Sequence, residues 1–464
     1  MDLEALSKLR ARAIPTFDMN SGLTTADYGW GTKNFRQLGL RKTELIIALL
    51  RARADPILTD ADALITRDPT PFIMRLRPEA QILVTSDHLM STTGKDLDVL
   101  EVPERAVASA WNIGYFYLHH STLSALLHWQ SECEEHPTLW DQNLFKDVLK
   151  IGGLRFDDRQ RPAIKQKRLF LGYNASLAIG ILPINTFCSG HTFFVQRMPQ
   201  RLGALPYSVH TTFQYSGAVG KTHRLREGML WDDSPEYYAP TKGLLTYTPR
   251  IRRELLRPSG VMDVASHFSL MNAQIVELRA AFLLAARLDR LLVLPRIVCG
   301  LDRFWAPHNG TIPGSDTTLP IEPCPVDHLL DLEKIERISP MEGLLREWSF
   351  FDNPRLPAAQ REPHAPLPPP ESLAPTALQP LHDRRAERVL NLTHMPDLFA
   401  TLSRDEQAAA MKRMLIWTSI WCCSVPPKKN GAGHVWYDMF WDVVPRTNRH
   451  GKLVDAPFVP TFGP

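Results

Sequence analysis

Residues 57–73 read ILTDADALITRDPTPFI, and this stretch decides how the first part of the chain folds. An apolar run reaches Leu58, two acids follow with one small residue between them (Asp60 and Asp62), and a second apolar run ends before Pro69. Short apolar runs bounded by turn-forming residues are typical of buried strands. The stretch therefore predicts a strand that ends in a turn carrying two carboxylates.

Short apolar stretches alternate with helical ones on either side of this turn. Residues 45–55 predict the end of a helix, 81–87 and 111–120 predict strands, and 121–135 predict the helix that follows. Such alternation is typical of an α/β domain, in which ligands bind at the carboxyl ends of the strands. We therefore expect an α/β domain over residues 1–250.

Three polar residues, Asp60, Asp87 and Asn112, lie at or beside the ends of these predicted strands. Aspartate and asparagine also favour turns, so a purely structural role is an equal alternative for each residue alone. Two carboxylates that converge in a turn offer the oxygen ligands of Mg²⁺ or Mn²⁺, ions that proteins commonly share with substrate phosphates. The pair Asp60 and Asp62 is thus a candidate clamp for a metal and a diphosphate.

The composition indicates a soluble protein with more than one domain. The chain has 464 residues, of which 44% are hydrophobic and 22% charged, and its net charge is +3. A length of this size favours two or three domains. We find no basic stripe, so nucleic acid is not an expected partner. No apolar run reaches the ~18 residues of a membrane span, and the first residues lack the core of a signal peptide.

The rest of the chain is expected to form three further segments. Residues 251–353 predict a second α/β unit, because a helix with apolar residues at 3,4,3 spacing precedes the buried strand LLVLP (291–295). Nine prolines among residues 354–380 predict an exposed linker without helix or strand. Residues 381–464 predict a helix and an aromatic-rich tail that packs against the body.

The stretch VHTTFQYSGAVGKTHRLRE (209–227) combines a histidine, glycines and cations. An imidazole would complete the coordination of Mn²⁺, which makes His210 a candidate ligand. Gly217 and Gly220 would let backbone N–H groups approach an anion, and Lys221 would neutralise phosphate charge. The alternative for His210 alone is a buried core histidine.

The stretch WDQN (140–143) opens a predicted helix with three polar residues, Asp141, Gln142 and Asn143. They would either cap the helix or line a sugar site, because polyols need paired donors and acceptors. Asn112, in WNIGYF, would serve a sugar site in the same way.

The order of these residues resembles retaining glycosyltransferases of the GT-A fold, and nearly the whole chain resembles the plant extensin arabinosyltransferases, glycosyltransferase family seventy-seven. The stretches that carry this resemblance are FDMNSGLTTADYGWG (17–31), WDQN, FCSGHTFFVQ (187–196), PYSVHTTFQYSGAVGKTHRLREGM (206–229), SPEYY (234–238), and IWCCS with GHVWYDMFWD (420–442). The resemblance implies an α/β, GT-A-like nucleotide-diphospho-sugar transferase domain.

The resemblance also implies an activity and a place in the cell. Such enzymes are Golgi type II membrane proteins that move L-arabinofuranose from UDP-β-L-arabinofuranose to arabinose on hydroxyproline of cell-wall glycoproteins. By position, Mn²⁺ (or Mg²⁺) would be held by Asp60, Asp62 and His210. The donor would contact Asp60, Asp62, Asp87, Asn112, Gly217, Gly220 and Lys221, and the reacting face would carry Asp141 and Gln142. Retention would follow from same-face attack through an oxocarbenium-like state, or from a covalent step on Asp141.

The second unit resembles the nucleotide domain of O-fucosyltransferase-like proteins. The glycine-rich phosphate loop expected before its helix is absent from the sequence, so we expect a structural role for this unit. Cys299 and Cys324 would form a disulfide in an oxidising lumen. No CxxC pair occurs, so we do not expect a zinc site.

The chain departs from the family pattern at its start. The strand and helix that hold the uridine should precede FDMNSG, where only sixteen residues stand. We therefore expect a longer protein with that strand and a membrane anchor, or else an inactive relative that binds nucleotide sugars. A metal-dependent phosphohydrolase is a further alternative, although haloacid-dehalogenase phosphatases have Thr or Val where this chain has Leu64.

Overall fold

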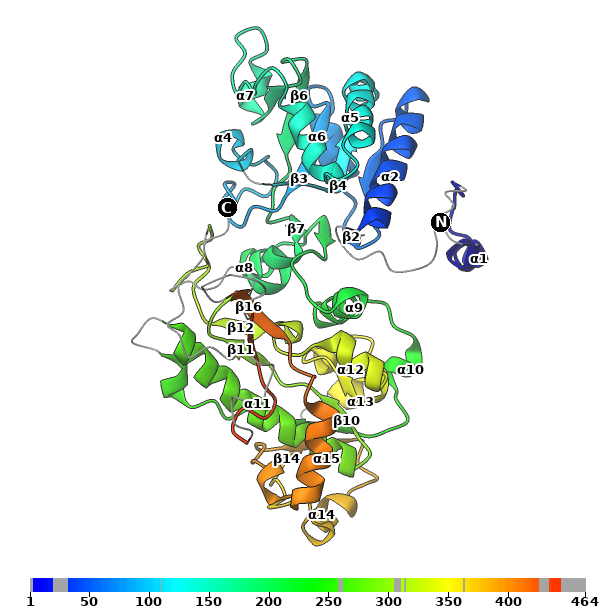
Figure 1. The fold of residues 1–464 in the computed structure, drawn as a ribbon. Helices are drawn as coiled ribbons and strands as arrows, with labels where there is room; N and C mark the ends of the chain where they lie inside the picture. Colours follow the sequence, from blue (N-terminus) through cyan, green and yellow to red (C-terminus); the bar gives the residue numbers. More distant parts are fainter. Residues whose placement is uncertain are drawn as a thin grey trace. The chain divides into compact units, whose positions relative to one another are not determined.

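The computed structural model divides the chain into two compact units, and each is described by itself (Figure 1). Unit 1 comprises Met1–Ser189 and Met198–His210, and unit 2 comprises Gly190–Arg197 and Thr211–Pro464. The structure describes residues 3–19, 32–108, 110–257, 262–303, 310–312, 314–361, 364–424 and 434–443.

The division between the units falls before residue 250, the boundary expected from the sequence. Strand β9 (Leu244–Tyr247) pairs in parallel with β10 (Leu291–Val293) and with β15 (Val389–Leu392), so it belongs to the sheet of unit 2. The pairing partners of β9 lie far along the chain, and its own four residues do not reveal them.

Unit 1 is built on a five-stranded mixed sheet with the order β1-β4-β3-β6-β5. Its strands are β1 (Ile57–Thr59), β3 (Ile82–Ser86), β4 (Trp111–Leu118), β5 (Phe170–Gly172) and β6 (Leu177–Ile181). Strands β3 and β6 are parallel, whereas the other pairs are antiparallel. A smaller three-stranded sheet joins β2 (Ala63–Ile65), β8 (Ser208–His210) and β7 (Phe187–Ser189).

Helices cover both faces of the large sheet, which gives unit 1 the α/β fold predicted from its sequence. One face carries α2 (Lys33–Arg51), α5 (Leu123–Glu135) and α6 (Asp141–Leu149), and their apolar sides share a core with β3 and β4. The other face carries α3 (Thr70–Leu76) and α7 (Ala163–Gln166). The short elements α1 (Leu3–Ala11), α4 (Pro103–Ala106) and α8 (Met198–Leu202) complete the α-helices described in this unit.

Unit 2 contains an all-parallel sheet with the order β13-β10-β9-β15-β14, which includes β13 (Leu345–Arg346) and β14 (Pro366–Leu367). Helix α11 (Val264–Arg287), which the apolar 3,4,3 spacing predicted, connects β9 to β10. The other helices described are α9 (Gly217–Glu227), α10 (Pro235–Tyr238), α12 (Leu332–Ile338), α13 (Ala358–Arg361), α14 (Pro375–His382) and α15 (Arg404–Met414). Two hairpins, β11 (Ile297–Cys299) with β12 (Ile321–Cys324) and β16 (Ile420–Ser424) with β17 (His434–Trp436), accompany the sheet.

Helix α11 includes a 22-residue stretch, Ser266–Arg287, that is long and apolar enough to cross a membrane by length and composition. Most of that stretch is buried inside the structure, and Leu270, Ile275 and Leu284 have no exposed surface. A helix that is apolar on most of its sides is also what a large core requires. The composition of α11 is therefore weak evidence for a membrane span.

The proline-rich stretch 354–380 differs from the linker that the sequence predicted. Strand β14 lies in this stretch at the edge of the sheet and pairs with β15, and helix α14 begins at Pro375. Prolines are tolerated at both places, because an edge strand and the first turn of a helix each have an N–H group without a partner in the element. Leu373 and Leu378 are buried, so this stretch contributes to the core of unit 2.

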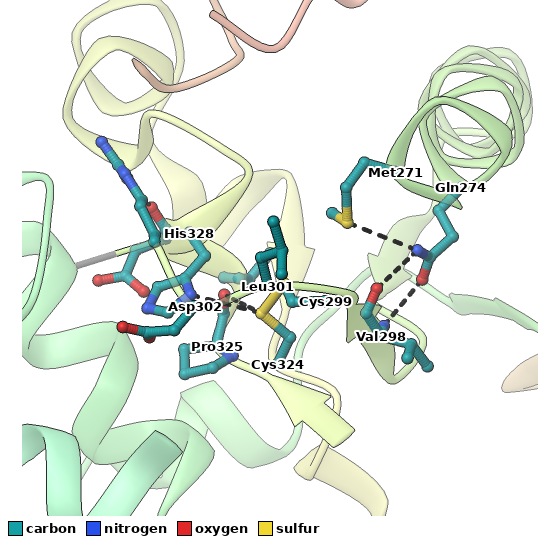
Figure 2. Close-up of a disulfide and its surroundings, with 12 residues drawn as sticks. Met271, Gln274, Val298, Cys299, Leu301, Asp302, Cys324, Pro325 and His328 are labelled. Carbon is teal, nitrogen blue, oxygen red and sulfur yellow. Dashed lines mark hydrogen bonds between the residues drawn. A yellow bond between two sulfur atoms is a disulfide. The ribbon is translucent and has the colours of Figure 1, made fainter. Parts of the chain in front are cut away.

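The predicted disulfide is confirmed. Cys299 and Cys324 are bonded, with 5.5 Å between their Cα atoms, and they join β11 to β12 (Figure 2). Gln274 of α11 accepts from the N–H of Val298 and donates to its carbonyl, both at 2.8 Å. The hairpin is thus fixed to α11 by two hydrogen bonds and closed by the covalent bond.

Replacing Cys299 and Cys324 together by alanine is expected to lower the free energy of unfolding of unit 2 by about 3 kcal/mol, because the bond closes a loop of 25 residues. Urea denaturation followed by tryptophan fluorescence would measure the loss. The matched control is Cys133→Ala, which removes a free, partly buried thiol. An unchanged unfolding midpoint in the double variant would contradict the prediction.

Candidate functional site

The two acids of residues 57–73 lie in the turn between β1 and β2, as the sequence predicted. Asp60 donates its N–H to the carbonyl of Gly114 in β4 at 2.7 Å, and its own carbonyl accepts from Ala63 at 3.0 Å. Strand β2 then pairs with β8 so that Ala63 lies opposite His210. The turn therefore brings both acids next to a histidine that is about 150 residues further along the chain.

The side chains of Asp60, Asp62 and His210 form one cluster, in which the potential ligand atoms all lie within 4.8 Å of one another. The Nε2 atom of His210 lies 3.4 Å from Oδ1 of Asp62. All three side chains are partly exposed, so an ion has access to the cluster. We call this group the acid–histidine cluster.

Asn112 orients the imidazole of His210. Its Oδ1 atom accepts from the N–H of Gly114 at 2.8 Å, and its Nδ2 atom donates to the carboxylate of Asp87 at 3.1 and 3.2 Å. These partners fix the orientation of the amide, so the atom 3.1 Å from Nδ1 of His210 is an oxygen that can only accept. Nδ1 therefore carries the proton, and Nε2 offers its lone pair on the side of Asp62.

Asp87 and Asn112 were predicted to contact a donor sugar. Asp87 directly follows β3 and Asn112 is the second residue of β4, so the antiparallel pairing brings them to the same edge of the sheet. Asn112 is buried, and its polar atoms bond to Asp87, Gly114 and His210. Desolvation by the surrounding protein raises the pKa of Asp87, while hydrogen bonds from the Asn112 amide oppose that rise. The contacts of Asn112 indicate a role in holding His210.

Gly114 makes room for the imidazole. A Cβ atom added at Gly114 would lie 2.1 Å from Cε1 of His210, far inside van der Waals contact. Only glycine leaves the ring in its place, because any side chain would have to displace either the ring or the strand.

Lys42 is a residue of this site that the sequence reasoning missed. Its ammonium, on α2, lies 2.6 Å from Oδ1 of Asp60 and donates to the carbonyl of Ile113 at 2.8 Å. The sequence does contain a signal for it. Lys42 precedes the buried Ile46 and Leu50 at intervals of four, so a charge stands on the apolar stripe of an amphipathic helix.

Asp141 is the first residue of α6, and helix α2 approaches it closely. A Cβ atom added at Gly39 would lie 2.9 Å from Oδ2 of Asp141. Burial raises the pKa of Asp141, and the nearby charge of Asp60 adds to the rise, whereas Lys42 and the N–H of Gln142 oppose it. Asp141 thus lies in the electrostatic field of both Lys42 and the acid–histidine cluster.

Gln142 was predicted to lie at the reacting face, and the structure buries it. Its Oε1 atom accepts from the N–H of Ile113 at 3.2 Å, which ties α6 to β4. Its Nε2 atom is buried without a hydrogen-bond partner among the described residues.

The remaining predicted donor residues lie in unit 2, on α9. Gly217 is the first residue of that helix and has a φ of +54°, a conformation that favours glycine. A Cβ atom at Gly220 would lie 1.7 Å from the carbonyl of Tyr215, so this glycine is required by the backbone of its own turn. The role of Lys221 toward a diphosphate stays a prediction.

Two further groups of potential metal ligands occur among the described residues, and both are engaged in structural contacts. Cys299 and Cys324 share a disulfide beside His328. Asp55 lies beside two histidines. Burial raises the pKa of Asp55, but hydrogen bonds from the His120 N–H and Arg77 outweigh this and lower it to about 2. The acid–histidine cluster is therefore the stronger candidate for a metal site.

Comparison with known proteins first defines the class of the chain. The nucleotide-diphospho-sugar transferase family matches residues 1–225, which include the whole acid–histidine cluster. The chain is thus a glycosyltransferase of α/β fold with a GT-A-like transferase domain.

A second comparison defines the family. The chain is 34% identical to the arabinosyltransferase XEG113 of Arabidopsis thaliana, over 96% of this chain and 72% of the relative's length. The chain belongs to the family of this arabinosyltransferase, glycosyltransferase family seventy-seven, which confirms the resemblance found in the sequence. No solved structure matches the chain. Of the stretches that carried the resemblance, residues 20–31 and Gly433 lie outside the described residues.

Proposed function

We propose that this protein transfers L-arabinofuranose from UDP-β-L-arabinofuranose to arabinosylated hydroxyproline of an extensin-like cell-wall glycoprotein, with retention of configuration and with the help of a divalent ion. The observation that carries the proposal is the acid–histidine cluster, found in a member of this family. The name of the Arabidopsis relative supports arabinose as the sugar.

The donor set of the cluster fits Mn²⁺ or Mg²⁺. Two carboxylates offer hard oxygen ligands, and an imidazole whose Nε2 atom lies on the side of Asp62 suits Mn²⁺ better than Mg²⁺. The absence of a side chain at Gly114 leaves room for the imidazole at the position where it would bind such an ion. When bound, the ion would neutralise the charge that develops on the departing diphosphate.

Asp141 is the proposed carboxylate at the reacting face. Its ionised form would stabilise the positive charge that develops at the anomeric carbon while the sugar changes partners. Same-face attack then requires no covalent intermediate, whereas a covalent step would place the sugar on Asp141. Mass spectrometry of protein quenched with a slow donor analogue distinguishes these routes, because an adduct on Asp141 would exclude same-face attack.

Replacing Asp141 by asparagine is expected to lower kcat by about 10²-fold, the usual cost of losing one electrostatic group at the reacting centre. The same change should not lower stability at neutral pH. The pKa of Asp141 is raised in the folded state, so the folded chain loses stability as the pH rises through that pKa. Asparagine does not ionise, so the variant does not lose stability in this way.

Thermal unfolding at pH 7 and at pH 4 checks the stability part of this prediction. The advantage of Asp141→Asn over the unchanged protein should shrink at the lower pH, because the carboxyl becomes increasingly protonated as the pH approaches the usual pKa of an aspartate. A variant that is less stable at pH 7 and fully active would show that Asp141 has only a structural role.

The cellular setting follows from the same family. We propose that the protein acts in the Golgi lumen as a type II membrane protein. The oxidising lumen is consistent with the disulfide between Cys299 and Cys324.

A donor panel tests the proposal. UDP-arabinofuranose, UDP-arabinopyranose, UDP-xylose and UDP-galactose are each supplied with Mn²⁺ and an arabinosylated hydroxyproline peptide, and transfer is followed by mass spectrometry. The expected result is transfer from UDP-arabinofuranose alone. Binding of Mn²⁺ and UDP without turnover would instead indicate an inactive relative, and phosphate release without an acceptor would indicate a phosphohydrolase.

A further inference from the structure

Helix α2 brings two residues to the candidate site from one of its faces. Gly39 and Lys42 are three residues apart, so they lie on the same side of the helix. Gly39 borders Asp141, and Lys42 bonds to Asp60. Helix α2 thus contacts both the reacting-face carboxylate and the acid–histidine cluster.

We infer that Lys42 is a positioning residue for the proposed transfer: its ammonium holds the Asp60 carboxylate in the orientation that binds the metal ion. This inference rests on the proposed function. The carboxylate of Asp60 has two oxygens, and Lys42 occupies Oδ1 at 2.6 Å. The oxygen left for an ion is Oδ2. A carboxylate held at one oxygen loses less rotational freedom when an ion binds at the other.

Lys42 is itself held at a defined place. Its ammonium also donates to the carbonyl of Ile113, which lies between Asn112 and Gly114 in β4. The ammonium further lies 5.5 Å from the centre of the Phe116 ring, within the range of a cation–π contact. Lys42 therefore joins helix α2, the Asp60 turn and the β4 residues that orient His210.

The charge of Lys42 has a second consequence for the same group of residues. Asp60, Asp62, Asp87 and Asp141 bring four carboxyl groups to this end of the sheet, and their mutual repulsion opposes a compact arrangement. A cation beside Asp60 reduces that repulsion before any ion binds. Lys42 therefore favours the arrangement that the ion requires.

Removing Lys42 has two opposite effects on metal binding. The loss of a positive charge strengthens the attraction of the cluster for a cation, and the loss of the two hydrogen bonds frees Asp60 to rotate. The ammonium is partly exposed, so its charge is screened by solvent. Loss of a group that orients a metal ligand commonly costs 10- to 100-fold in affinity, so we expect positioning to dominate.

The test compares Lys42→Met, Lys42→Arg and Arg41→Met in the full chain. Lys42→Met removes the contact and the charge, whereas Lys42→Arg keeps the charge. Arg41→Met removes a cation from the adjacent position of the same helix, where Arg41 pairs only with Glu44 among the described residues. Mn²⁺ binding is measured directly, from the electron paramagnetic resonance signal of free Mn²⁺, and kcat and KM are measured for the donor.

We expect Lys42→Met to raise the Kd for Mn²⁺ by about 10-fold or more and to raise the KM for the donor, with Lys42→Arg intermediate and Arg41→Met unchanged. Equal or tighter Mn²⁺ binding by Lys42→Met, in a variant with unchanged thermal stability, would overturn the inference while leaving the proposed function intact. If Lys42→Met is unstable, normal Mn²⁺ binding by a stable Lys42→Arg with normal kinetics would overturn it as well, because the longer, planar guanidinium does not place its donors where the ammonium places them. Absence of Mn²⁺ binding in the unchanged protein would remove the proposed function itself.

Discussion

Replacing Asp62 by asparagine is expected to lower kcat/KM for sugar transfer by about 10³-fold or more, equivalent to about 4 kcal/mol of transition-state stabilisation. Asp62 and His210 lie side by side in the acid–histidine cluster, and asparagine offers a neutral oxygen in place of a charged one. An ion would bind more weakly, and the charge on the departing diphosphate would be poorly neutralised. Transfer assays at several Mn²⁺ concentrations would measure the loss, which high Mn²⁺ should restore in part.

A matched control for this change stands six residues away. Asp68 is exposed and bonds to the N–H of Thr70 at the start of α3, so Asp68→Asn makes the same substitution outside the cluster. Its activity should equal that of the unchanged protein. Equal activity of Asp62→Asn and Asp68→Asn would exclude the acid–histidine cluster as the metal site.

Replacing Gly114 by alanine is expected to disrupt the site through a single methyl group. The new Cβ would lie 2.1 Å from the His210 ring, so the ring or strand β4 has to move. Loss of the bond between His210 and Asn112 would follow, and Mn²⁺ affinity should fall by about 100-fold. The overpacked site should also lower the free energy of unfolding by about 1–3 kcal/mol, measurable by urea denaturation.

Gly343→Ala is the control for the added methyl group, because a Cβ atom there meets nothing within 4 Å. It should leave both Mn²⁺ affinity and stability unchanged. A Gly114→Ala variant that binds Mn²⁺ normally would show that His210 is not a ligand.

The elements of unit 1 were predictable because their signals are local. Residues 81–87 and 111–120 predicted strands, and the structure has β3 at Ile82–Ser86 and β4 at Trp111–Leu118. The turn with Asp60 and Asp62 was likewise visible as two acids after an apolar run. Bringing His210 to this turn required the pairing of β2 with β8. The resemblance to a family implied that His210 shares a metal with the two acids, and the local pattern did not.

The features that the sequence did not reveal depend on long-range contacts. Lys42 bonds to a carbonyl 71 residues further along the chain, so its partner cannot be found from spacing on the helix. Strand β9 has only four residues, and its neighbours in the sheet lie beyond residue 290. The prolines of 354–380 excluded helix and strand by composition, whereas the structure places Pro366 in an edge strand and Pro375 in the first turn of a helix, where an N–H group is not needed.

The path of the chain between the two units has a consequence for how such enzymes can change. The chain leaves unit 1 after Ser189, returns at Met198, and leaves again after His210. The segment that leaves unit 1 and returns to it, residues 190–197, contains the short helix η2 (His191–Val195), whose residues are all buried.

Neither unit is therefore encoded by one continuous stretch of gene. Genetic recombination at residue 210 would join unit 1 to the second unit of another protein. Residues 190–197, which belong to unit 2, would then come from a different protein than the rest of that unit. Recombination of whole domains is thus a poor route to new specificity for this architecture. We expect relatives with different donors or acceptors to differ by scattered substitutions, and chimaeric proteins to fold only when residues 190–197 are exchanged together with the second half of the chain.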